Sequence, residues 1–211
     1  MLSRLTACLL ILLSVAAAPR TYVLETGSYD QITIGDGEIW LGVYPASDHT
    51  EIRQCTLRVS RVPNPVDGTY PNQVTKIACT DSNPLFMLKG SAKVKPGNVT
   101  ALYKQGDDYP DKIAVPLNGK SYLLQTSDTQ SVERLTLKAG SQHMVLGECA
   151  SRDSIYPVWA GDLDGDGRLD VYVRIEHHNF GVEQILFLSS ADATGKAMTA
   201  QAAKFTGRKL D

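Results

Sequence analysis

Residues 161–176 read GDLDGDGRLDVYVRIE and join an acidic loop to a strand. Aspartates stand at positions 162, 164, 166 and 170, and glycines stand on either side of Asp166, at positions 165 and 167. Beyond the loop, Leu169, Val171, Val173 and Ile175 alternate with polar or larger side chains. A period of two is typical of a half-buried β-strand and not of a helix. The stretch therefore predicts a loop that runs directly into a strand.

Short segments with the same period recur along the chain and are separated by turn residues. Asn118-Gly119 stands between two of them and is a strong hairpin signal. The best helical candidate is the alanine-rich tail Ala191–Lys204. We therefore predict an all-β fold, an antiparallel sandwich or a barrel-like arrangement, with a calcium-loop hairpin near the C-terminus. The predicted strands are Gln31–Ile34, Glu38–Tyr44, Glu51–Val62, Gln73–Thr80, Pro84–Leu88, Val99–Lys104, Lys112–Leu117, Lys120–Thr126, Val132–Lys138, Gln142–Glu148, Arg168–Glu176 and Glu183–Ser189.

Residues 1–18 are typical of a secretory signal peptide. Arg4 precedes an apolar run from Leu9 to Leu13, and Ala16 and Ala18 fit the small-residue cleavage pattern. The apolar run is too short to span a bilayer, and we expect no transmembrane segment elsewhere. The sequence therefore predicts an exported protein, periplasmic or extracellular.

A Pro-Gly turn at Lys95–Asn98 marks the candidate boundary within the mature chain. It would separate a β-rich half, residues 19–95, from a second half, residues 96–211, that carries the acidic loop. A single domain over residues 19–211 is an equal alternative, since the chain is long enough for one sizeable core.

The aspartates of the loop would repel one another without a cation. Two unit charges about 4 Å apart interact by about 4 kcal/mol at an effective dielectric constant of about 20. With Asp162 as position 1, Asp164 and Asp166 are positions 3 and 5 and Gly167 is position 6, as at the start of an EF-hand calcium loop. Position 12 is Val173 in place of the bidentate acid of an EF-hand, and a strand follows. The loop is therefore predicted to bind Ca²⁺ without being an EF-hand, and the alternative is a solvated acidic turn.

The segment from Ala160 to Val173 resembles the calcium loop of the FG-GAP and VCBS repeats, which are known from β-propeller blades and secreted bacterial proteins. The resemblance implies a loop within a β-hairpin, where Ca²⁺ orders the structure and does no chemistry. Its full signature occurs once in the chain, which argues against a complete propeller. The metal ligands that it implies are the side chains of Asp162, Asp164, Asp166 and Asp170 and the carbonyl oxygen of Arg168.

Export would leave three of the four cysteines, because Cys8 lies in the signal segment. Cys55 and Cys79 lie on inward faces of neighbouring predicted strands, which suggests a Cys55–Cys79 disulfide in an oxidising compartment. Cys149 would then be an odd, buried thiol. The other two pairings stay open at this point.

Composition argues against one class of partner. The formal net charge is −2 at pH 7 and there is no basic patch, so we expect no nucleic-acid partner. The sequence also lacks the Gly-x-Ser-x-Gly, His-Glu-x-x-His and phosphate-loop motifs. The leading hypothesis is therefore an exported, non-catalytic β-protein with a structural Ca²⁺ site.

Two alternatives use other residues. Trp40 and Tyr44 share one face of a predicted strand and could form an exposed stacking platform, as in a carbohydrate- or cell-surface-binding module, or line a second buried face. A secreted hydrolase with an unrecognised site would need a deep pocket that gathers His177, His178 and acids.

Overall fold

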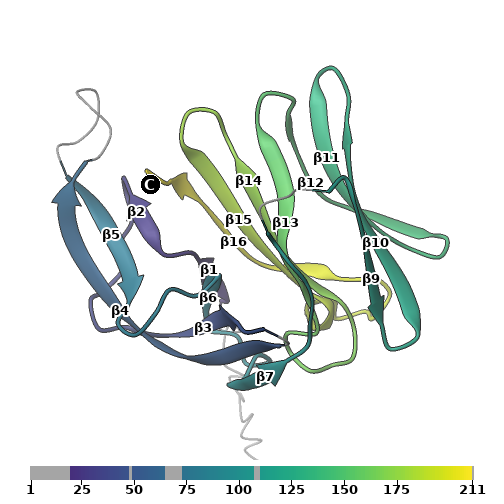
Figure 1. Ribbon diagram of the computed structural model, residues 1–211, viewed down its shortest axis with the longest axis horizontal. Coiled ribbons are helices and arrows are strands. Elements are labelled where there is room, and N and C mark those ends of the chain that lie inside the picture. Colours follow the sequence, from purple (N-terminus) through teal and green to yellow (C-terminus); the bar gives the residue numbers. More distant parts are fainter. Residues whose placement is uncertain (1–19, 48, 65–72, 107–109, 211) are drawn as a thin grey trace, which may run out of the picture.

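The computed structural model describes residues 20–47, 49–64, 73–106 and 110–210, and it is almost entirely β (Figure 1). The only helical element among these residues is a single 3₁₀ turn, η1 (Ser189–Ala191). All of the strand pairs are antiparallel. The predicted all-β class is confirmed.

The first part of the chain forms a seven-stranded sheet, which we call the N-terminal sheet. Its order is β1-β6-β3-β4-β5-β2, and β7 pairs with β4. Its strands are β1 (Tyr22–Leu24), β2 (Gly27–Tyr29), β3 (Ile39–Pro45), β4 (Thr50–Pro63), β5 (Gln73–Cys79), β6 (Phe86–Lys89) and β7 (Gly97–Val99).

The rest of the chain forms two further sheets. The four-stranded sheet has the order β12-β11-β10-β9, and the central sheet has the order β16-β15-β14-β13-β8. The four-stranded sheet contains β9 (Lys112–Leu117), β10 (Lys120–Asp128), β11 (Val132–Ala139) and β12 (Gln142–Ala150). The central sheet contains β8 (Ala101–Lys104), β13 (Ser154–Gly161), β14 (Asp170–Glu176), β15 (Gly181–Leu188) and β16 (Ala200–Arg208).

The central sheet lies between the other two, which makes three layers (Figure 1). On one face, Val171 and Val173 of β14 pack in a cluster with Leu124 and Leu137 of the four-stranded sheet. On the other face, Tyr172 of the same strand stacks on Phe86 of the N-terminal sheet, with 4.1 Å between ring centroids. Strand β14 is therefore buried on both faces, and the prediction of a half-buried strand is wrong, because both faces of its sheet are covered.

The chain crosses between layers close to the candidate domain boundary. Strand β7, which follows that boundary, still pairs with β4, which precedes it. Strand β8 then pairs with β13 in the central sheet. A division into residues 19–95 and 96–211 stays a prediction, although one apolar cluster contains residues of both parts, such as Phe86 and Tyr172.

The predicted disulfide is present. Cys55 of β4 is bonded to Cys79 of β5, with 5.5 Å between the Cα atoms, and both residues are buried. Closing a loop of this length contributes roughly 3–4 kcal/mol to stability. Cys149 is free and buried, and burial raises the pKa of its thiol to about 11, which makes it a poor nucleophile.

The last part of the C-terminal tail is a strand, and Ala191–Lys204, the best helical candidate in the sequence, does not form an α-helix. Residues 200–208 pair with β15 along its whole length as β16. Alanine favours a helix by only fractions of a kcal/mol per residue, which pairing at a sheet edge readily outweighs.

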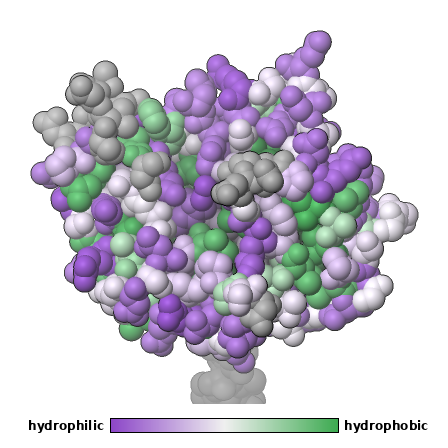
Figure 2. Space-filling model, viewed as in Figure 1, coloured by the Kyte–Doolittle hydropathy of each residue, from purple (hydrophilic) through white to green (hydrophobic). Residues whose placement is uncertain are grey.

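The outer surface is mostly hydrophilic on the side seen in Figure 2, with a hydrophobic area over the four-stranded sheet. Across the part of the chain that the structure describes, no helix has both the length and the apolar character needed to span a bilayer. The predicted signal peptide lies outside the described residues.

Candidate metal centre

The aspartate loop, residues 162–169, connects β13 to β14 and lies within a β-hairpin. Gly161 and Asp170 pair with each other at its base. Gly165 and Gly167 have φ values of 75° and 80°, a backbone conformation that glycine adopts without strain. The two glycines therefore allow the turn that keeps the aspartates on one short loop.

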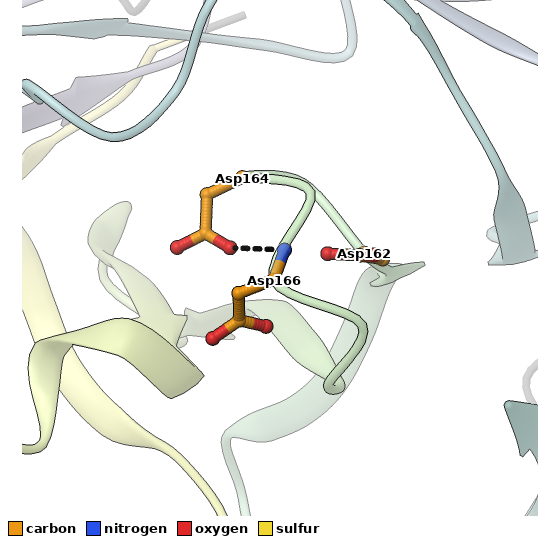
Figure 3. Close-up of side chains that lie close together, drawn as sticks. All are labelled: Asp162, Asp164 and Asp166. Atoms are coloured by element: carbon orange, nitrogen blue, oxygen red, sulfur yellow. Dashed lines mark hydrogen bonds between the residues drawn. The ribbon is translucent and has the colours of Figure 1, made fainter. Parts of the chain in front are cut away.

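Three of the predicted ligands lie together. One carboxylate oxygen from each of Asp162, Asp164 and Asp166 lies within 4.8 Å of the other two (Figure 3). Oxygen ligands about 2.3–2.6 Å from one Ca²⁺ ion are separated by distances of this size. The group could therefore hold a metal ion.

The aspartates also fold the loop back on itself. Asp162 Oδ2 accepts a hydrogen bond from the Gly167 N–H at 2.9 Å, and Asp164 Oδ1 accepts one from the Asp166 N–H at 3.3 Å (Figure 3). The Arg168 N–H donates to Asp166 Oδ1 at 2.9 Å. Such side-chain-to-backbone bonds are the usual way in which aspartates stabilise tight turns.

One carboxylate oxygen of the aspartate loop lacks a hydrogen-bond partner in the described part of the chain. Asp162 Oδ1 is buried and has no hydrogen-bond partner among the described residues. A buried, unpaired carboxylate oxygen is costly, and coordination of a cation is one way to satisfy it. The donor set therefore fits a hard cation.

Asp170, the fourth predicted aspartate ligand, lies apart from the other three and accepts hydrogen bonds from the backbone. It is fully buried and does not join the group of three. Its Oδ2 accepts the N–H groups of Leu163 at 2.7 Å and Asp164 at 3.3 Å, and its Oδ1 accepts that of Ser189 at 2.7 Å. Asp170 thus fixes the backbone beneath the loop, and its coordination of a metal stays a prediction, as does that of the Arg168 carbonyl.

Two serines complete the centre, and the sequence pattern does not predict them. The hydroxyl of Ser189 donates to Asp166 Oδ2 at 2.7 Å, and that of Ser190 donates to Asp164 Oδ2. Both belong to η1, directly after β15. The signal that could have found them is two adjacent hydroxyl residues at the end of the strand next to β14.

The acidic groups affect one another's protonation. Burial raises the pKa of Asp164, and the charges of Asp166 and Asp162 add to the effect. Burial raises the pKa of Asp170 to about 8, and the negative charge of Asp164 contributes to this increase. The hydrogen bonds that Asp170 accepts from backbone N–H groups lower its pKa and partly oppose the increase. A bound cation would favour the charged forms and oppose these shifts.

A pH dependence follows for the metal-free protein. Because the pKa of Asp170 is higher in the folded state than in the unfolded chain, its stabilising contribution is fully present below about pH 4. This contribution is lost as the pH rises through about 8. We expect the free energy of unfolding in a chelator, from urea titrations at several pH values, to decrease over this range in wild type. The decrease should be smaller in Asp170→Asn, and equal pH profiles would contradict the assignment.

The aromatic residues do not form an exposed platform. Trp40 and Tyr44 are each only 6% exposed. Trp40 packs with Cys55 and Leu57, and the Arg53 guanidinium lies over the Tyr44 ring at 4.2 Å. The alternative in which Trp40 and Tyr44 form an exposed stacking platform is therefore wrong. The alternative in which they line a second buried face is correct, because the face of β3 that carries these rings is covered.

The histidines lie at the other end of the β13–β14 hairpin. His177 Nδ1 is 2.8 Å from Asp153 Oδ2, and His178 Nδ1 is 3.4 Å from Asp153 Oδ1. They line a pocket of about 230 Å³ with Arg174 and Glu176, and none of its described lining residues is a serine, threonine or cysteine. The contacts of the two histidines with Asp153 connect two neighbouring turns.

Comparison of the chain with protein-family models, curated proteins and solved structures finds no match. The resemblance to FG-GAP and VCBS repeats thus rests on the loop residues alone and stays a prediction.

Proposed function

We propose that the protein is an exported, non-catalytic β-protein in which the aspartate loop binds a structural Ca²⁺ ion. The observation that carries the proposal is the group of three carboxylates, in which Asp162 Oδ1 is buried without a partner. An all-oxygen donor set favours Ca²⁺ or Mg²⁺ over softer metals. Ca²⁺ accepts six to eight oxygen ligands in a flexible geometry, whereas Mg²⁺ requires a nearly ideal octahedron, so side chains on a loop favour Ca²⁺.

The position of the loop indicates what the ion would do. The aspartate loop connects three separate parts of the structure: its carboxylates accept hydrogen bonds from Ser189 and Ser190 of η1, and its backbone accepts one from Asn118 of the β9–β10 turn. Asn118 Nδ2 donates to the Gly167 carbonyl at 2.8 Å. An ion that removes the repulsion between the carboxylates would therefore stabilise the junction between the central and four-stranded sheets. Carboxylates that coordinate an ion are poor proton carriers, which supports a structural role over catalysis.

Export is supported by two independent features. The sequence begins with a segment typical of a signal peptide, and Cys55 and Cys79 form a disulfide, as is common in oxidising compartments. Calcium modules of such compartments work with dissociation constants of about 10⁻⁴–10⁻³ M.

A melting experiment tests the metal site. With Ca²⁺ at about 10–100 times its dissociation constant we expect a stabilisation of about 1.4–2.7 kcal/mol, or roughly 3–10 °C in melting temperature. Asp162→Asn removes a charge and a ligand while keeping an oxygen for the Gly167 N–H, so the shift should fall to near zero. The measurement is the melting temperature by circular dichroism, in chelator and in Ca²⁺.

Two controls make the result specific. Asp128→Asn changes an exposed aspartate at the end of β10, and should keep the full Ca²⁺ shift. Mg²⁺ at the same concentration should shift the wild-type melting temperature less than Ca²⁺ does. An equal Ca²⁺ shift in Asp162→Asn and wild type would show that the loop is not the binding site.

A further inference from the structure

A second polar feature lies next to the aspartate loop. It is a pocket of about 600 Å³, which we call the cationic pocket. Four segments line it: the start of β10, the β11–β12 turn, the loop residue Arg168, and residues 195–198 before β16. In Figure 1 the β9–β10 turn and the yellow segment before β16 lie on the same side of the molecule.

The charges in this pocket are all positive. Lys120, Arg168 and Lys196 line it, and none of its described lining residues is acidic. Within the described ranges, no carboxylate forms a salt bridge with any of these three side chains, whereas Lys89, Lys204 and Lys209 each have one. The chain has a net charge of −2, so the positive charge here is a local feature. Three like charges around one hollow attract an anion.

One side of the pocket, formed by Arg168 and the segment before β16, is held in a defined shape. The guanidinium of Arg168 donates to the Ala197 carbonyl at 2.7 Å, which connects the aspartate loop to the segment that carries Lys196. Asp192 in turn accepts the Thr194 N–H at 2.9 Å and the Ala197 N–H at 2.7 Å, which folds that segment into a turn. A side chain that is already held in place, as that of Arg168 is, loses less entropy when a ligand binds.

We propose that the cationic pocket binds a hydrophilic ligand through an oxyanion group. Lysine and arginine side chains are the usual donors to carboxylate, sulfate and phosphate oxygens, and their bonds to such anions are stronger than neutral ones. The exposed Ser121 and Gln142 side chains at the rim add polar contacts for a hydrophilic ligand. The pocket shares Arg168 with the aspartate loop, but it differs from the metal site because its charged side chains are cationic and Lys120 and Lys196 lie outside the loop.

Titration calorimetry of the full chain at low ionic strength tests this inference. The probes are inorganic sulfate, inorganic phosphate and galacturonate, with methyl galactoside as a neutral control. We expect at least one oxyanion to bind and the neutral sugar not to bind, and the preferred probe identifies the group as sulfate, phosphate or carboxylate. In the double variant Lys120→Gln/Lys196→Gln, the dissociation constant should rise at least tenfold.

A matched variant distinguishes binding in the pocket from a general attraction of anions to the positive charges of the protein. Lys112→Gln removes an exposed lysine of β9 that does not line the pocket, and should leave the dissociation constant unchanged. All substituted lysines are exposed, and circular dichroism checks that the variants fold. The proposal is overturned if no oxyanion binds wild type, or if Lys112→Gln weakens binding as much as the double variant.

Discussion

Replacing Trp159 by alanine is expected to lower the free energy of unfolding by about 3–5 kcal/mol. Trp159 is fully buried in the cluster between the central and N-terminal sheets. Its ring packs edge-on against Phe86 with 6.3 Å between centroids, and its Nε1–H donates to Thr50 Oγ1 at 3.2 Å. The truncation would remove these contacts, open a cavity and leave the Thr50 hydroxyl without this partner.

Urea denaturation followed by circular dichroism measures the effect. Trp159→Phe keeps an aromatic ring and loses mainly the indole hydrogen bond, so its loss should be clearly smaller. Ile39→Ala is the surface control, because Ile39 is 59% exposed, and its effect should stay within about 0.5 kcal/mol. If Trp159→Ala cost no more than Ile39→Ala, the packing of these two sheets would be wrong.

Arg174→Ala is expected to cost about 3 kcal/mol, at the lower end of the range for breaking a buried ion pair. Arg174 Nε donates to Glu25 Oε1 at 2.8 Å, and its NH2 group contacts the other oxygen. The Glu25 side chain is only 3% exposed and also accepts bonds from the Tyr172 hydroxyl at 2.8 Å and Lys209 Nζ at 3.1 Å. Loss of Arg174 would leave the buried carboxylate of Glu25 with Lys209 as its remaining cationic partner. Because this partner remains, we expect a loss of stability at the lower end of the range.

Conservative and double variants show whether the charge pair is responsible. Arg174→Lys keeps a cation but not the two-pronged contact, so it should lose less stability than Arg174→Ala. The double variant Glu25→Gln/Arg174→Ala removes both charges and should be more stable than Arg174→Ala alone. Arg58→Ala, at an exposed position of β4, should have little effect. Equal losses in Arg58→Ala and Arg174→Ala would contradict this account.

Much of the fold can be predicted from the sequence where the local pattern and the local turn agree. The Asn118-Gly119 hairpin is confirmed: both residues have positive φ, and Leu117 pairs with Lys120 across the turn. In segments with one face in the core, such as β9, buried and exposed residues alternate. The larger apolar residues of such a segment stand at every second position of its sequence, which predicts a strand.

In the central sheet, the sequence predicts the segments that form β8, β14 and β15, but it does not predict β13 or β16. The sequence pattern does not predict β13, since every residue from Ile155 to Gly161 is buried and no alternation remains. Pro157 lies beside a register shift in the pairing with β14, as expected for a proline inside a sheet. Because the sequence pattern does not show that the second face of β3 is covered, it left open whether Trp40 and Tyr44 are exposed or line a second buried face, and the structure shows that they are buried.

The candidate site was predictable to the extent that it lies in one loop. The group of Asp162, Asp164 and Asp166 can be predicted from the sequence, because the three residues lie within five consecutive positions of one loop. Ser189 and Ser190 come from a distant segment, and only the register of β15 against β14 brings them to the aspartates. The chemistry of the cationic pocket likewise depends on packing, because its lysines come from separate segments.

The three-layer arrangement has a consequence for the order in which the chain folds. Four of the five strands that form the central sheet follow residue 153, after all of the strands that they cover. Long-range contacts such as that between Trp159 and Thr50, 109 residues apart, can form only once this last part has been synthesised. A nascent chain that stops before β13 would present two uncovered apolar sheet faces to water, the state from which β-proteins aggregate.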